Sequence, residues 1–140
     1  MPTRAQLSKS AEHEGGHTGL MRAALEGRTE TVKTLLESRA DVNEKDDEGR
    51  TALMFAVTNL QNDCAKALLQ HGADVNIRAN DGSTALMLAA SSGDTEIVQD
   101  LLGKGADVSA KFTQTGKTAL MLAKEKDYNE IVQLLEGSRS

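Results

Sequence analysis

The sequence predicts an all-α fold, a solenoid of stacked helix-turn-helix units joined by β-turn or hairpin loops. Two recurring strings carry this prediction. Ala-Asp-Val recurs with its aspartate at residues 41, 74 and 107, a period of 33 residues. Thr-Ala-Leu-Met begins at residues 51, 84 and 118, with one residue inserted before the last copy. A fixed period of this length is typical of an array in which one supersecondary unit stacks on the next.

The clearest unit, residues 80–108, reads as turn, short helix, short helix and loop. Asn80-Asp81-Gly82 signals a turn because glycine accepts a positive φ. Thr84 lies where an N-cap belongs, ahead of a helix-forming run over residues 85–90. Residues 91–94 are expected to end this helix, and apolar residues at helical spacing predict a second helix from about Thr95. Neither helix is long enough to be stable alone, so each must bury its apolar face against a neighbouring unit.

These residues resemble the ankyrin repeat, whose pattern contains Asp-x-x-Gly-x-Thr-Pro-Leu-His, two alanines, a glycine, Val-x-x-Leu-Leu and Gly-Ala-Asp-Val-Asn. The best unit has Gly82-Ser83-Thr84-Ala85-Leu86-Met87, Ala89-Ala90, Gly93, Val98, Leu101-Leu102 and Gly105-Ala106-Asp107-Val108. The match recurs over about nine-tenths of the chain. The chain departs from the pattern where alanine replaces proline and where Met21, Met54, Met87 and Met121 replace histidine. The family's histidine hydrogen bond is therefore missing, and methionine is expected to fill the space as a flexible apolar side chain.

Residues 1–12 are polar and show no periodicity, so we interpret them as an N-terminal tail, and the resemblance implies an ankyrin-repeat domain over 13–140. Its repeats fall at approximately 13–45, 46–78, 79–111 and 112–137. Arg39 and Leu60 occupy positions where other repeats have glycine, so both are expected to be strained weak points. Lys124 and Glu136 replace apolar residues of the inner repeats, as a C-terminal capping repeat would require.

Two short motifs resemble a zinc site and a nucleotide-binding loop, but the residues around them do not fit either function. His13-Glu14-Gly15-Gly16-His17 matches the H-E-x-x-H zinc-protease pattern, which needs both histidines on one helical face and a third ligand. Two adjacent glycines disfavour that helix, so we expect no metal to bind. Gly116-Lys117-Thr118 resembles the end of a P-loop, but Lys111 stands where the motif requires its first glycine. No catalytic residue and no cofactor are expected, and the chain is interpreted as not being an enzyme.

Composition narrows the function classes further. The chain has 140 residues, a net charge of −5, a pI of about 5.2 and 2% aromatic residues, which disfavours nucleic-acid binding. No apolar run is long enough to span a membrane, and the first residues lack the apolar segment of a signal peptide. Cys64 is the single cysteine and takes the place of Ile97, so we expect a buried free thiol and a cytoplasmic or nuclear location. A monomer is expected in the absence of a partner.

The resemblance implies a protein-protein interaction module that uses turn tips and the exposed side of the first helices. The candidate partner-binding residues are Leu25; Lys45, Asp47, Glu48, Arg50, Thr58, Asn59 and Leu60; Arg78, Asn80, Asp81, Ser83, Ser91 and Ser92; and Lys111, Phe112, Gln114, Lys117, Glu125 and Lys126. Leu25, Leu60 and Phe112 are candidate apolar anchors because they are expected to be exposed. The turn of repeat 2 is acidic on balance and that of repeat 4 is basic, which predicts a partner with a basic segment at repeat 2 and an acidic one at repeat 4.

Two functions remain open at this point. One is an adaptor or scaffold that docks a protein or peptide, and the alternative is a regulatory accessory protein that inhibits or helps assemble a partner enzyme. If the source is animal, Asn43 and Asn76 also resemble ankyrin asparagines that a hydroxylase modifies.

Overall fold

The computed structural model describes residues 18–137. The tail expected over residues 1–12 and the histidine motif at residues 13–17 lie outside the described residues. The chain divides into two compact units, Met1–Ala73 and Asp74–Ser140, which we call unit 1 and unit 2 and describe separately.

The described residues form eight α-helices and no strand, which confirms the all-α prediction. In chain order the helices are α2 (Gly19–Glu26), α3 (Thr29–Glu37), α4 (Ala52–Thr58), α5 (Asn62–Gln70), α6 (Ala85–Ser92), α7 (Thr95–Gly103), α8 (Ala119–Glu125) and α9 (Asn129–Gly137). An isolated antiparallel bridge joins Lys111 to Thr118. Within residues 18–137, no helix has the length and apolar character needed to cross a membrane.

A threonine starts the first helix of every repeat. The Oγ1 atoms of Thr18, Thr51, Thr84 and Thr118 each accept a hydrogen bond of 3.2–3.4 Å from the backbone N–H three residues later. This bond satisfies one amide that has no partner inside the helix. The predicted N-cap is therefore confirmed, and the helix ends within the predicted break at residues 91–94, although Ser91 and Ser92 are still helical. Helix α6 continues through Ser92 and ends at Gly93, whose φ of 78° supplies a left-handed C-cap.

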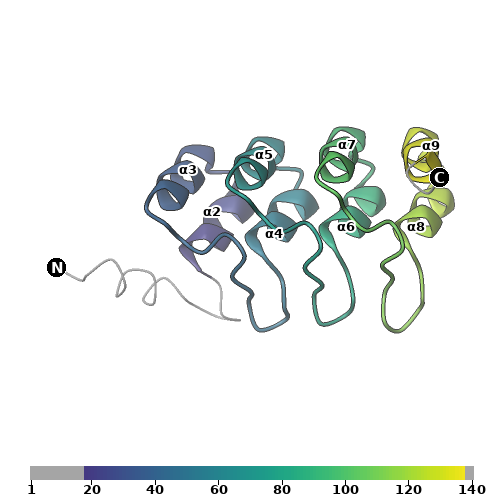
Figure 1. Cartoon of the computed structure of the whole chain (residues 1–140), viewed down its shortest axis with the longest axis horizontal. Helices are drawn as coiled ribbons and strands as arrows, with labels where there is room; N and C mark the ends of the chain where they lie inside the picture. Colours follow the sequence, from purple (N-terminus) through teal and green to yellow (C-terminus); the bar gives the residue numbers. More distant parts are fainter. Residues whose placement is uncertain (1–17, 138–140) are drawn as a thin grey trace. The chain divides into compact units, whose positions relative to one another are not determined.

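In unit 1, the first helices α2 and α4 pack side by side, and the second helices α3 and α5 form another layer, drawn above them in Figure 1. Val32, Leu53 and Leu68 are buried between these helices. Cys64 is buried as predicted, with its Sγ 3.4 Å from the Oγ1 of Thr29. The apolar faces read from the sequence therefore form the core of this unit.

Unit 2 repeats the arrangement with α6 beside α8 and α7 beside α9 (Figure 1). Its fully buried side chains include Leu86, Ile97, Leu101, Ile131 and Leu135. Because α6 and α7 are short, their stability depends on this packing against α8 and α9 rather than on helix propensity.

The four methionines that replace the family histidine do not behave alike. Met21, Met54 and Met87 are buried, as predicted, but Met121 is 48% exposed. Met21 lies on α2, which packs on α4, and Met87 lies on α6, which packs on α8. Among the described residues no further first helix follows α8, so the prediction of a space-filling methionine is wrong for Met121.

Three residues other than glycine adopt a positive φ in the described chain: Arg39 at 68°, Leu60 at 58° and Asp127 at 59°. The first two confirm the expectation that they occupy glycine positions of the repeat. Asp127 was missed, although it lies 34 residues after Gly93, the interval that the inserted residue creates. A left-handed conformation costs a residue with a Cβ about 1–2 kcal/mol, so these are points of stored strain.

Candidate protein-binding surface

The hairpin that precedes α4, residues 42–50, is organised around a buried carboxylate, and we call it the Arg50 hairpin. Asp46 accepts hydrogen bonds from the backbone N–H of Glu48 at 2.9 Å and of Arg50 at 2.8 Å, and from Arg50 Nε at 2.9 Å. Burial raises the pKa of Asp46, but the hydrogen bonds from Arg50 and Glu48 outweigh that effect and hold its pKa below the ordinary value. The carboxylate therefore stays ionised and fixes the hairpin.

The Arg50 side chain contacts residues of its own repeat. Its guanidinium carbon lies 4.8 Å from the centroid of the Phe55 ring, a cation–π contact, and its Nη1 lies 3.6 Å from Glu48 Oε2. Phe55 is buried. The negative charge of Asp46 is neutralised by the positive charge of Arg50. The turn therefore presents fewer exposed negative charges than the sequence indicates.

The predicted contact residues of unit 1 lie on the Arg50 hairpin and at the ends of α2 and α4. Lys45, Asp47, Glu48, Thr58 and Asn59 are exposed. Leu25 is 38% exposed and Leu60 is 56% exposed, as predicted for candidate anchors. The Asn59 side chain also donates to Phe55 O at 2.9 Å, so its position is fixed.

Unit 2 has two hairpins, the Arg78 hairpin (residues 75–83) and the Lys111 hairpin (residues 108–117), which run side by side (Figure 1). Arg78 Nη2 donates to Lys111 O at 2.5 Å, and Arg78 Nε donates to Gly82 O at 3.1 Å. The backbone N–H of Thr113 donates to Asp81 O at 2.9 Å. A Cβ on Gly82 would lie 2.7 Å from Lys111 O, so the hairpins pack too closely there for any larger residue.

A second connection lies at the base of the same hairpins. Asn76 Nδ2 donates to Gly105 O at 3.1 Å, and Asn76 Oδ1 accepts from the backbone N–H of Asp107 at 2.7 Å. Both polar atoms of this amide are therefore engaged. The Asp107 carboxylate accepts from the Ser109 hydroxyl and backbone N–H, and these bonds hold the pKa of Asp107 below its ordinary value.

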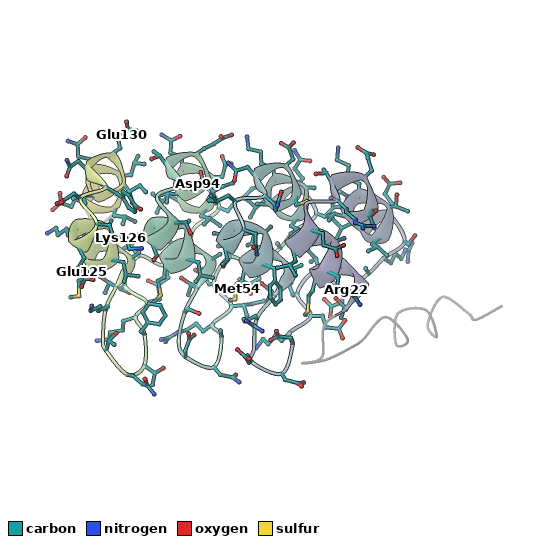
Figure 2. All side chains as sticks on the ribbon, turned by 180° about the vertical axis from the view of Figure 1, so that it is seen from behind. Arg22, Met54, Asp94, Glu125, Lys126 and Glu130 are labelled. Carbon is teal, nitrogen blue, oxygen red and sulfur yellow. The ribbon has the colours of Figure 1, made fainter. Side chains whose placement is uncertain are left out.

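The ends of α6 and α8 supply the remaining polar side chains of unit 2. Lys117 Nζ lies 2.8 Å from Glu125 Oε2, an ion pair between the Lys111 hairpin and α8. Lys126 Nζ donates to Ser91 O at 3.0 Å, which links the end of α8 to α6. Figure 2 shows Glu125 and Lys126 next to each other at this end of α8. Ser91 and Ser92 are half-buried, whereas Glu125 and Lys126 are exposed.

Within residues 18–137, no group of three or more His, Cys, Asp or Glu side chains is placed to hold a metal ion. A family model described as "Ankyrin repeats (3 copies)" matches residues 4–79 and 72–138. The chain belongs to the ankyrin repeat family. A search of curated proteins finds no match to it.

Ankyrin repeats are protein-protein interaction modules, and the family is typically non-enzymatic. Most of the predicted contact residues are exposed. In addition to those of unit 1 named above, the exposed residues include Arg78, Asn80, Asp81, Lys111 and Gln114. Arg50 and Lys117 are half-buried through their ion pairs.

Two predicted contact residues are placed differently by the structure. Ser83 is buried, and its N–H and hydroxyl both donate to Asp81 Oδ1, so it shapes the Arg78 hairpin instead of contacting a partner. Phe112 is half-buried and directly precedes the tip of its hairpin, where its N–H donates to Lys117 O and its carbonyl accepts from the N–H of Gly116. The exposed tip is Thr113 to Thr115. Repeat alignment does not reveal the Ser83 bonds, because they depend on side chains that vary between repeats, whereas the backbone bonds of Phe112 recur at Asp46 and Ala79.

Proposed function

We propose that this ankyrin-repeat chain is a non-enzymatic adaptor that binds a protein or peptide through its hairpins and the ends of its first helices. The observation that supports this most is the rigid pairing of the two hairpins of unit 2. Arg78 joins the Lys111 hairpin through Lys111 O, and Asn76 holds the base of both hairpins. Loops carried on a packed helical scaffold are a common place for binding residues.

Rigid hairpins favour binding because ordering loops on association costs free energy. Each side chain immobilised on binding costs roughly 0.5–1.5 kcal/mol, and a loop that is already ordered avoids much of that cost. The exposed Gln114 and Asp81 stand on hairpins whose backbones are already bonded to each other. Cys64 is buried and forms no disulfide, which supports the proposal that the protein acts in a reducing compartment such as the cytoplasm or nucleus.

A photo-cross-linking experiment tests this surface. A photoreactive residue replaces Gln114 on the Lys111 hairpin or, as a matched control, Gln133, an exposed glutamine on α9. We expect proteins from cell extract to be cross-linked from residue 114 and not from residue 133. Cross-linking from residue 133 alone would instead indicate that partners contact the second-helix side, and the proposed surface would be wrong.

The alternative role as a regulatory accessory protein predicts a further result. The cross-linked partner would be an enzyme, and its activity or assembly would change on addition of the purified chain. An adaptor would leave that activity unchanged, so an assay with and without the chain distinguishes the two roles.

A further inference from the structure

A basic residue recurs at one position of every described hairpin. Lys45, Arg78 and Lys111 are 33 residues apart, and all three side chains are exposed. The position is therefore the same in the three repeats, but the surroundings of the positive charge differ. That difference separates the Arg50 hairpin of unit 1 from the two hairpins of unit 2.

In unit 1, acidic residues follow the basic residue along the chain. Lys45 is followed by the buried Asp46 and the exposed Asp47 and Glu48. The other cation of the hairpin, Arg50, lies on the carboxylate of Asp46 at 2.9 Å. The positive charges of this hairpin are thus balanced locally.

In unit 2, backbone carbonyls hold the side chains of Arg78 and Lys126. Arg78 donates to the carbonyls of Gly82 and Lys111, which carry no net charge, and Lys111 itself is exposed beside this bond. Lys126 likewise donates to a carbonyl, that of Ser91. The carboxylates of Asp81 and Asp107 accept from Ser83 and Ser109 in their own hairpins. Lys117 forms an ion pair with Glu125, and, besides the hydrogen bonds from Ser109, the positive charge of Arg78 helps to hold the pKa of Asp107 below its ordinary value.

Arg78 retains donors for a ligand. A guanidinium has five N–H donors, and the two bonds to carbonyls use two of them. The remaining N–H groups belong to a side chain whose position is already fixed, so its rotamer entropy is not lost again on binding. Such a fixed guanidinium is well suited to a carboxylate, because charge-assisted bonds to carboxylates are short and strong.

We propose that unit 2 binds an acidic, extended segment of a protein partner, with Arg78 and Lys111 contacting its carboxylates and Lys126 providing a further positive charge. This inference rests on the proposed binding function and specifies the chemistry of the partner. A protein segment fits better than a nucleic acid because the net charge of the chain is −5. Long-range repulsion opposes a polyanion, whereas contacts with a few carboxylates act within the Debye length of roughly 8 Å at physiological salt.

Selection of short peptides from a random display library on the full chain tests the proposal. We expect the selected peptides to be enriched in Asp and Glu. Lys111→Glu reverses an exposed charge but keeps the backbone carbonyl to which Arg78 donates, and it should weaken the binding of those peptides by about fivefold or more. Lys45→Glu makes the same change at the same hairpin position of unit 1 and should alter binding by less than about twofold.

The outcomes separate the two proposals. Peptides without acidic enrichment, or equal effects of Lys111→Glu and Lys45→Glu, would overturn the acidic-segment inference and leave the binding function standing. Selection of no peptide at all would count against the binding function itself. Displacement of the selected peptides by polyuridylic acid at physiological salt would replace the inference with nucleic-acid binding. Circular dichroism of each variant, with Lys111→Ala as a milder change, ensures that a loss of binding is not a loss of fold.

Discussion

Asp46 Oδ2 accepts a hydrogen bond of 2.9 Å from Arg50 Nε, and the same carboxylate caps two backbone amides of the turn between them. The Asp46 side chain is fully buried, so water cannot take the place of these hydrogen-bond donors if they are lost. One buried carboxylate thus sets the conformation of the Arg50 hairpin and, through Arg50, the cation–π contact with Phe55.

We expect Asp46→Asn to lower the free energy of unfolding by about 1–3 kcal/mol at neutral pH, because hydrogen bonds to a charged acceptor are lost. The pKa of Asp46 is lowered in the folded state, so its contribution is present above the ordinary value of 3.8 and is lost as the pH falls through the folded pKa. Urea titrations of the two proteins should therefore converge as the pH falls below that value. Glu37→Gln removes an exposed carboxylate at the end of α3 and should change stability little. A pH-independent difference would show that the ionised carboxylate is not responsible.

Arg39→Gly is expected to stabilise unit 1 by about 0.5–1 kcal/mol. Its φ of 68° strains any side chain with a Cβ, and glycine relieves that strain at some cost in unfolded-state entropy. Leu60→Gly should give a similar gain, because Leu60 has a φ of 58° and an exposed side chain with little packing to lose. The urea midpoint measures both effects. Arg39→Ala is the control, since alanine removes the arginine side chain without relieving the backbone, and a gain as large as that of glycine would refute the strain argument.

The strain at Arg39 and Leu60 could be predicted because the repeats of one chain can be aligned with each other. Where the other repeats have glycine, a residue of another type stands out in that alignment. The helix starts follow from the recurring threonines in the same way. The exposure of Met121 could not be read from its repeat, because it depends on which helices pack on α8. The burial of Ser83 depends on hydrogen bonds to Asp81 within a single hairpin, so the candidate surface was predicted less accurately than the fold. Phe112 is half-buried and has the backbone bonds of its counterparts Asp46 and Ala79.

Gly93 and Gly105 share a positive φ, 78° and 85°, but differ in their surroundings. A Cβ on Gly93 would lie 2.8 Å from Cζ of Tyr128, whereas a Cβ on Gly105 would meet nothing within 4 Å. Gly105→Ala should therefore cost only the backbone strain, about 1 kcal/mol, and Gly93→Ala should cost more through overlap with the ring.

The double variant Gly93→Ala with Tyr128→Ala checks the cause of that difference. Truncating the ring removes the overlap, so adding Gly93→Ala in the Tyr128→Ala background should cost about as much as Gly105→Ala does. If Gly93→Ala costs the same with and without the tyrosine ring, the contact between Gly93 and Tyr128 does not limit this position.

Arg78→Lys is expected to loosen the two hairpins of unit 2 while leaving their charge unchanged. The guanidinium bonds Gly82 O and Lys111 O at once, and an ammonium group on a flexible stem cannot reproduce that planar arrangement. Hydrogen exchange should therefore become faster at the amides of Gly82 and Thr113, which bond within and between these hairpins. Lys111→Arg is the matched control, because it also exchanges one cation for another but leaves both carbonyl acceptors and Arg78 in place, and it should leave those amides protected. Unchanged protection in Arg78→Lys would mean that the backbone bond from Thr113 to Asp81 and the amide of Asn76 suffice to hold the hairpins, and that Arg78 is available to a partner without a structural role.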